Sequence, residues 1–325
     1  MDRIESTQNP RVKAAKALHT VKGRNESGMF LCEGEHMVRE AVRAGGEAHT
    51  VGAAYALGSA FAVDTLFVDE AYAEKFAELA EEAQADHTFL VPAHVLAAIS
   101  TVKSPQGIAA VVRLQAPRIT TRQDLGVPGV SPAAFGIAAG EDTWGDDTEI
   151  NGDDMPPDGA GDGEAADDED FSPSILGDKL VLLEAVQDPG NVGTILRTMD
   201  AAGFTGAVLA PGCADPYAPK ALRATMGSIF RIPTMQVEDA AQAAAVLAGE
   251  GYAVIAAALD GEDFFTRAPL PDKVCLIIGN EGAGITKETL AAATHRYRLP
   301  MQGGAESLNA AAAAAIMIYE IAYRK

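Results

Sequence analysis

The sequence is poor in cysteine and has no long apolar run. Its 325 residues hold three cysteines, Cys32, Cys213 and Cys275, which lie far apart. We therefore expect neither a disulfide framework nor a Cys-x-x-Cys zinc site, and a reducing, cytoplasmic setting is indicated. No stretch of eighteen apolar residues occurs, so we expect no membrane-spanning helix. The polar, basic N-terminus predicts no signal peptide, and the six scattered histidines predict no metal site.

Basic residues are also fewer than acidic residues, which gives a formal net charge of −21. Residues 118–176 carry −13 of this charge, whereas residues 1–24 are locally +4. The overall charge therefore does not exclude an RNA partner. The middle segment is rich in Asp, Glu and Gly and too poor in apolar residues to fold, so we expect a largely disordered acidic linker. The alternative is an acidic arm that imitates nucleic acid or binds a basic partner.

The residues before this segment, 1–117, alternate short strands with helices and predict a small α/β domain. Asn9 and Pro10 are expected to start a basic helix that runs to about Val21. Strands are expected at 29–34, 64–69, 87–91 and 108–114, and further helices at 35–44, 71–83 and from Pro92.

Residues 177–325 show stronger strands, at 179–186, 206–210, 252–259 and 273–279. These near-continuous apolar runs are typical of a parallel sheet covered by helices on both faces. Helices are expected at 191–202, 218–226, 239–248, 286–293 and 307–323. Because open parallel sheets bind ligands at the carboxyl ends of their strands, chemistry is expected in the loops that follow the strands.

The first such loop lies within residues 187–204. Asn191 can cap the helix that follows, and Gly193 lets another group approach the backbone closely. Arg197 lies on the second turn, nearly opposite Asn191 in helical phase unless Asn191 lies outside the helix. Taken alone, this loop is equally well explained as a capped helix with a surface arginine.

Two further loops follow later strands. Residues 277–285 hold three glycines in the order G-x-x-G-x-G, which is the wrong order for a dinucleotide-binding fingerprint. In residues 299–325, Ser307 can cap an alanine-rich helix, with Asn309 in its first turn. A tight connection and a core helix would explain these two loops equally well.

Together, the three loops resemble the motifs of the SpoU (TrmH-type) RNA ribose methyltransferases of the SPOUT superfamily. The family's three motifs occur in order, each after a strand. The matching residues are Asn191, Gly193, Arg197, Gly279, Asn280, Glu281, Gly282, Pro300, Met301, Ser307, Leu308 and Asn309. Residues 213–233 resemble a further part of that catalytic domain. The segments IESTQNPRVKAAKAL and FLCEGEHMVREAV are similar to the ribosomal-protein-like substrate-binding domain of many members.

The resemblance implies that S-adenosylmethionine methylates a ribose 2′-hydroxyl of rRNA or tRNA, and the first domain favours rRNA. It also implies a parallel-sheet catalytic domain with a C-terminal trefoil knot, and a homodimer formed through that domain. The catalytic residues would be Arg197, Asn191, Glu281, Ser307 and Asn309. The cofactor would contact Leu209, Ala210, Gly279, Asn280, Gly282, Leu299, Met301, Ser307 and Leu308. Because a guanidinium stays protonated, Arg197 is expected to stabilise the oxyanion or anchor a phosphate, and the general base is left open.

The basic N-terminal helix supplies our candidates for contact with RNA phosphates. The candidates are Arg11, Lys13, Lys16, Lys22 and Arg24, with Lys220 and Arg223 from the second domain. A solvated amphipathic surface is the alternative for the helix. Two rival functions are weighed against the methyltransferase: a catalytically inactive RNA-binding protein on the same fold, and a nucleotide-dependent dehydrogenase. The motif side chains count against the first, and the glycine order counts against the second.

Overall fold

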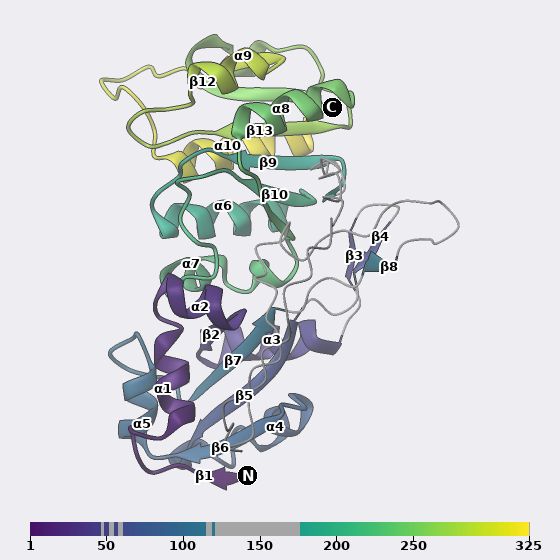
Figure 1. Ribbon diagram of the computed structural model, residues 1–325. Coiled ribbons are helices and arrows are strands. Elements are labelled where there is room, and N and C mark those ends of the chain that lie inside the picture. Colours follow the sequence, from purple (N-terminus) through teal and green to yellow (C-terminus); the bar gives the residue numbers. More distant parts are fainter. Residues whose placement is uncertain (47–48, 52–54, 58–60, 115–118, 121–175, 325) are drawn as a thin grey trace, which may run out of the picture.

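Two sheets organise the protein into two α/β units, which lie one above the other in Figure 1. The computed structural model describes residues 1–46, 49–51, 55–57, 61–114, 119–120 and 176–324. The predicted acidic linker, 118–176, falls almost entirely outside the described residues, so both the linker and the domain boundaries stay predictions.

The N-terminal unit is built on a mixed five-stranded sheet in the order β1-β6-β5-β7-β2. Strand β7 runs antiparallel to both of its neighbours, whereas β1, β6 and β5 are parallel. The strands are β1 (Asp2–Arg3), β2 (Met29–Glu33), β5 (Phe61–Asp69), β6 (His87–Val91) and β7 (Ile108–Leu114). The helices are α1 (Pro10–Ala17), α2 (Val21–Ser27), α3 (Glu35–Gly46), α4 (Ala77–Glu82) and α5 (Ala93–Ile99). A separate small sheet holds β3 (His49–Val51), β4 (Tyr55–Leu57) and β8 (Ile119–Thr120).

Side chains alternate between the two faces of this sheet, as the twofold period of a strand requires. Leu66 and Val68 of β5 pack with α3 and α4. Phe67, between them, packs with α1 and α5 on the opposite face. Both faces are therefore covered.

The C-terminal unit is a six-stranded sheet in which every strand pair is parallel, in the order β11-β10-β9-β13-β12-β14. The strands are β9 (Lys179–Leu183), β10 (Gly206–Leu209), β11 (Thr234–Gln236), β12 (Ala253–Asp263), β13 (Val274–Ile278) and β14 (His295–Arg298). The helices are α6 (Pro189–Ala202), α7 (Pro219–Thr225), α8 (Ala240–Gly249), α9 (Lys287–Ala292) and α10 (Ala310–Tyr323). Helices α6, α7 and α10 cover one face and α8 and α9 the other, which confirms the predicted parallel sheet with two covered faces.

The two units share one continuous apolar core. Phe30 and Phe61 of the N-terminal unit pack against Phe230 of the C-terminal unit, with ring centroids 6.1 and 5.0 Å apart. Tyr217 packs on Phe30 at 4.9 Å. Because large aromatic side chains dominate such contacts, the units are held in a defined orientation.

Several predicted boundaries were wrong. The basic helix expected to reach Val21 ends at Ala17, because Thr20 accepts a hydrogen bond from the backbone of Gly23 and starts α2. In the segment 71–83, α4 begins only at Ala77. The short strands β1 and β11 were missed, and each lies at the edge of its sheet, whereas β14 is the strand expected before the third loop. None of the helices in the described residues is both long and apolar enough to cross a bilayer.

Candidate active site

Hydrogen bonds between side chains join the three predicted loops at the carboxyl edge of the C-terminal sheet. Asn191 donates through Nδ2 to Oε1 of Glu281, at 2.8 Å. Asn309 donates through Nδ2 to Oδ1 of Asn191, at 3.0 Å. The structure therefore brings together three residues that come from the first, second and third motif.

The carboxylate of Glu281 also holds the first loop by its backbone. It accepts hydrogen bonds from the N–H groups of Gln187 and Asp188, at 3.3 and 3.5 Å. Desolvation by itself would raise the pKa of Glu281, but the hydrogen bonds from Asn191 and these backbone groups outweigh it, so the pKa lies below its usual value. Glu281 is therefore an ionised acceptor at neutral pH rather than a proton donor.

Asp188, and not Asn191, caps α6. Its side chain accepts from the backbone N–H of Gly190 at 2.6 Å and pairs with Nζ of Lys220 at 2.8 Å. The hydrogen bond from Lys220 lowers the pKa of Asp188. The predicted cap was wrong because Asn191 lies inside the first turn, where its side chain is used for contacts with the other two loops.

The glycine-rich second loop is closed on itself. Asn280 and Gly284 exchange backbone hydrogen bonds of 3.0 and 2.9 Å, and a Cβ on Gly279 would lie only 2.5 Å from the backbone of Gly284. Asn280 donates to the carbonyl oxygen of Ala185, and its Oδ1 accepts from the N–H groups of Gly282 and the following residue. Asn280 thus shapes the loop, and the N–H of Gly282 is already bonded within it.

In the third loop, Asn309 rather than Ser307 is the N-cap of α10, because its Oδ1 accepts from the backbone N–H groups of Ala311 and Ala312. Ser307 and Leu308 are exposed just before the helix. Leu299 and Met301 are half-buried where the chain leaves β14. All four side chains are therefore at least partly accessible to solvent.

Arg197 lies on a different face of α6 from Asn191. Six residues along a helix turn the side chain by about 120°, because each residue advances about 100°. Arg197 is exposed beside Thr194 and Ala201, and it has no hydrogen-bond or ion-pair partner among the described residues. Its guanidinium is free to meet a group that comes from outside the chain.

Gly193 serves helix packing, not ligand approach. A Cβ there would lie 2.4 Å from the carbonyl oxygen of Ala221 and 2.7 Å from the Cβ of Ala224, both on α7. Only glycine lets α6 and α7 come this close.

One structural carboxylate was missed by the sequence analysis. Glu184 is buried at the end of β9 and accepts three hydrogen bonds, from the backbone N–H and hydroxyl of Thr286 and from the hydroxyl of Thr289. It ties the second loop to the start of α9. The only sequence signal is an acidic residue that ends an otherwise apolar run.

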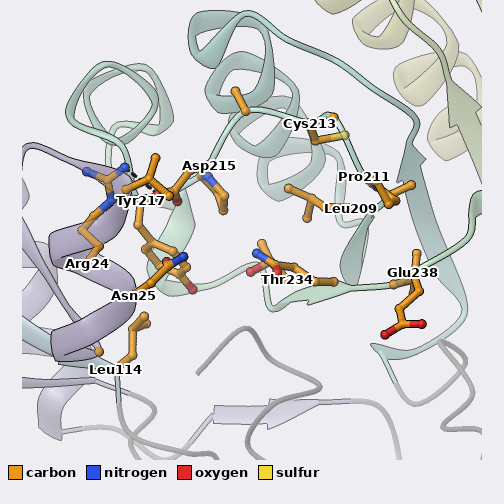
Figure 2. Close-up of a pocket in the computed structure, with 18 of the residues that line it drawn as sticks. Arg24, Asn25, Leu114, Leu209, Pro211, Cys213, Asp215, Tyr217, Thr234 and Glu238 are labelled. Atoms are coloured by element: carbon orange, nitrogen blue, oxygen red, sulfur yellow. Dashed lines mark hydrogen bonds and ion pairs between the residues drawn. The ribbon is translucent and has the colours of Figure 1, made fainter. Parts of the chain in front are cut away.

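The structure does not bring Leu209 and Ala210 together with the other predicted cofactor residues. Leu209 ends β10 and Ala210 follows it, and β9 separates this strand from β13. Figure 2 shows their surroundings, a cavity of about 620 Å³ between α2 and the ends of β10 and β11. Leu259, which is 68% exposed, lies in β12 three residues beyond the stretch that pairs with β13 and is a further candidate contact.

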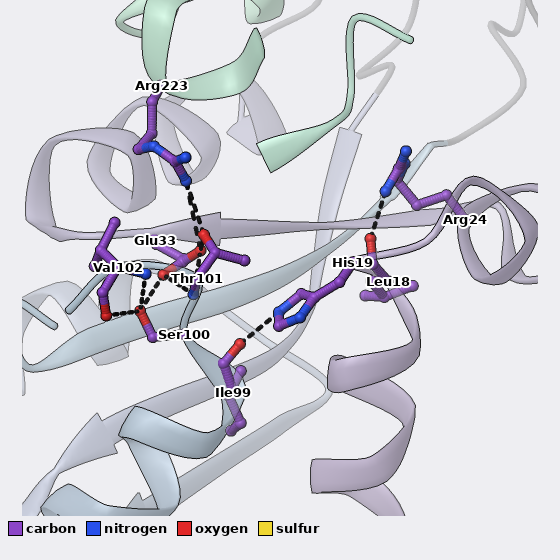
Figure 3. Close-up of polar contacts among 9 residues, drawn as sticks. All are labelled: Leu18, His19, Arg24, Glu33, Ile99, Ser100, Thr101, Val102 and Arg223. Carbon is purple, nitrogen blue, oxygen red and sulfur yellow. Dashed lines mark hydrogen bonds and ion pairs between the residues drawn. The ribbon is translucent and has the colours of Figure 1, made fainter. Parts of the chain in front are cut away.

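Arg24 was also wrongly predicted, as a contact for RNA phosphate. Its side chain is 5% exposed and pairs with Asp215 at 2.6 Å, while Nη1 donates to the carbonyl oxygen of Leu18 (Figures 2 and 3). A buried cation needs such a partner, so Arg24 joins the two units.

The other predicted RNA contacts differ in accessibility. Arg11 lies 2.7 Å from His87, and Arg223 donates to the hydroxyl of Thr101 across the interface between the units. The remaining candidates, Lys13, Lys16, Lys22 and Lys220, are exposed. Whether any of them contacts RNA stays a prediction.

Comparison with known proteins agrees with this arrangement along the whole chain. Residues 178–319 match the SpoU rRNA Methylase family, and residues 9–110 match the MRM3-like substrate binding domain. A 23S rRNA (guanosine(2553)-2′-O)-methyltransferase of Bacillus subtilis is 29% identical over 99% of each chain. A 23S rRNA (uridine(2479)-2′-O)-methyltransferase of Streptomyces viridochromogenes is 35% identical over 43% of this chain and 50% of its own.

Solved structures resemble the fold over nearly the full length. An AdoMet-bound rRNA methyltransferase from Sinorhizobium meliloti superposes with a TM-score of 0.70 at 27% identity, covering 98% of this chain and 97% of that chain. The fold and the three joined loops therefore define an RNA methyltransferase. Residues 178–319 thus form a SpoU rRNA methylase domain, which follows an MRM3-like substrate-binding domain.

Proposed function

We propose that this protein transfers a methyl group from S-adenosylmethionine to a ribose 2′-hydroxyl of rRNA. The observation that carries the proposal is the hydrogen-bonded chain Asn309–Asn191–Glu281, which fixes the three family motifs against one another. Two proteins that match over nearly the whole chain are rRNA methyltransferases by name, which favours rRNA over tRNA. This observation disfavours the inactive RNA-binding alternative, because a protein without catalytic activity does not need these hydrogen bonds between the three motifs.

The residues at the carboxyl edge of the sheet fit the cofactor. Leu308 is 38% exposed and Leu259, in β12, is 68% exposed, so apolar surface is available for a flat adenine ring. A Cβ on Gly303 or Gly304 would meet nothing within 4 Å, which leaves open backbone beside these side chains. When bound there, S-adenosylmethionine supplies an electrophilic methyl group on a sulfonium.

Positioning is the main contribution of the chain to this reaction. The ionised Glu281 and Asn191 hold the first loop, and the cap by Asn309 holds the start of α10. Ser307 offers a hydroxyl on the open side of the same edge. Arg197 stays protonated and can stabilise the developing oxyanion or hold the neighbouring phosphate.

We further propose that the catalytic unit forms a homodimer and ends in a trefoil knot. Ile316, Tyr319 and Tyr323 form an exposed apolar stripe on α10, and the two tyrosine rings stack at 5.6 Å. Such a stripe favours burial against a second copy. The knot is supported by the third loop, which returns to the first loop before α10 packs on α6. The reaction would take place in the cytoplasm, in keeping with an rRNA substrate and three free cysteines.

The proposal is tested with tritiated S-adenosylmethionine and separate pools of unmodified rRNA and tRNA. We expect label in rRNA, on a nuclease-resistant 2′-O-methylated dinucleotide. Arg197→Ala should lower the rate by about 10²- to 10³-fold, while cofactor binding measured by calorimetry is unchanged. Arg43→Ala, at an exposed arginine of α3, is the matched control and should keep the wild-type rate. Absence of both label and cofactor binding in the wild-type protein would refute the proposal.

A further inference from the structure

A second cavity, which the proposed reaction does not use, lies between the N-terminal sheet and α7. It has a volume of about 320 Å³, within the range of small-ligand pockets. Its inner wall is apolar and buried, formed by Met37, Leu96, Ile108 and Ala109. We call this cavity the α7 pocket. None of the motif residues of the active site lines it.

Polar groups without partners face the mouth of the α7 pocket. Ser104 and Gln106 line it, are exposed, and make no side-chain hydrogen bond within the described chain. Oε1 of Gln106 lies only 2.7 Å from where a Cβ on Gly34 would stand, and Gly34 has a φ of +85°. The glycine therefore lets the amide lie against the backbone. An amide offers both a donor and an acceptor, which suits the edge of a nucleobase.

A fixed cation stands at the rim of the same pocket. Arg223 is 42% exposed, and its Nη1 donates to the hydroxyl of Thr101 at 2.8 Å (Figure 3). Its Nη1 also lies 4.0 Å from Oε1 of Glu33, a buried carboxylate that accepts hydrogen bonds from Ser100 and Thr101. Because Glu33 and Thr101 belong to the N-terminal unit, the two units together hold the guanidinium in place with donors left for a phosphate.

A methionine with a strained backbone also lines the α7 pocket. Met226 ends α7 with a φ of +48°, in the left-handed region that non-glycine residues rarely adopt. Its carbonyl oxygen accepts a hydrogen bond from Nε2 of His36 at 3.0 Å, and its side chain stays 44% exposed. Strained backbone of this kind is concentrated at functional sites, and a thioether packs well on a flat ring.

Helix α7 connects this pocket to the active site. Lys220, in its first turn, pairs with Asp188, the residue that caps α6 in front of Asn191. Arg223 lies one turn further along α7. At 1.5 Å per residue, Arg223 and Met226 lie about 4.5 and 9 Å along the helix axis from Lys220. Because a stacked strand advances about 3.4 Å per nucleotide, the pocket lies a few nucleotides from the first loop.

We propose that the α7 pocket binds one unstacked nucleobase of the rRNA, a few nucleotides from the methylated ribose, with Arg223 on its phosphate. The inference rests on the proposed function, because it takes single-stranded rRNA as the substrate. Proteins that recognise RNA by sequence take unpaired bases into apolar slots and hydrogen-bond their edges. The apolar wall and the unpartnered amide meet these two requirements, and the fixed cation beside them is available to the phosphate.

The test is photocrosslinking of full-length protein to 23S rRNA transcripts that contain 4-thiouridine or 6-thioguanosine, with peptides located by mass spectrometry. We expect crosslinks to peptides that contain Met226 or residues 100–109. Ser104→Trp should fill the mouth and lower their yield about tenfold, while crosslinks elsewhere persist. Gln106→Ala should weaken rRNA binding about five- to tenfold. Gln8→Ala, an exposed glutamine of the same unit outside the pocket, is the matched control.

Two results would overturn the inference. One is a set of crosslinks confined to other surfaces. The other is wild-type yield and affinity in both pocket variants when circular dichroism shows that they are folded. Methyl transfer by the same wild-type preparation is measured separately. A protein that crosslinks through the pocket but transfers no methyl group would refute the proposed function alone, and an active protein without pocket crosslinks would refute this inference alone.

Discussion

Replacing Gly193 with alanine tests whether close packing of α6 on α7 positions the first loop. The new Cβ would lie 2.4 Å from the carbonyl oxygen of Ala221, whereas ordinary contacts begin at 3.4 Å. The helices would therefore separate by about 1 Å. Overpacking of this kind lowers the free energy of unfolding by about 1–3 kcal/mol. The higher helix propensity of alanine relative to glycine offsets up to about 1 kcal/mol of this loss. We expect a net loss of about 1–2 kcal/mol, or roughly 2–8 °C in Tm.

Thermal unfolding followed by circular dichroism measures this effect, and Gly249→Ala is the matched control. Gly249 is the last residue of α8, and a Cβ there meets nothing within 4 Å. The control should keep or raise the Tm, because only the propensity gain applies. The methyl-transfer rate should fall in Gly193→Ala as well, since α6 carries both Asn191 and Arg197. A Gly193→Ala protein as stable as the Gly249→Ala protein would refute the packing argument.

Three further predictions concern charge and association. The pKa of Glu281 is lowered in the folded protein. The stability that ionised Glu281 contributes to the fold is therefore complete above the unfolded pKa of about 4.3 and is lost as the pH falls through the lower folded pKa. Glu281→Gln should therefore flatten the dependence of Tm on pH between about 3 and 5; an unchanged profile would contradict this. Lys13→Ala or Lys16→Ala should each reduce the slope of log K for rRNA binding against log salt concentration by about 0.7–0.9. Arg24→Met should leave this slope unchanged, and a reduced slope in Arg24→Met would show that Arg24 contacts RNA. Tyr319→Glu should shift the protein from dimer to monomer in sedimentation, and a wild-type profile would exclude the α10 face.

The local sequence determined most of the elements of this fold. Apolar runs of five or more residues predicted the central strands, because a strand that is buried on both faces carries apolar side chains on both of them. The edge strands β1 and β11 were missed, since they are two and three residues long and are defined by pairing with a neighbour. Turn and cap residues indicated where α6 and α10 begin but not which residue caps them.

Only the tertiary structure decided which residues meet. Asn191 bonds to Glu281 and to Asn309 across 90 and 118 residues of sequence, and the order of the parallel strands brings these loops to one edge. The same ordering places Leu209 two strands away from the glycine-rich second loop, because β9 lies between β10 and β13. Arg24 looks like its basic neighbours in the sequence, yet the fold buries it against Asp215. Burial and pairing depend on distant parts of the chain, so a local pattern of charges cannot specify them.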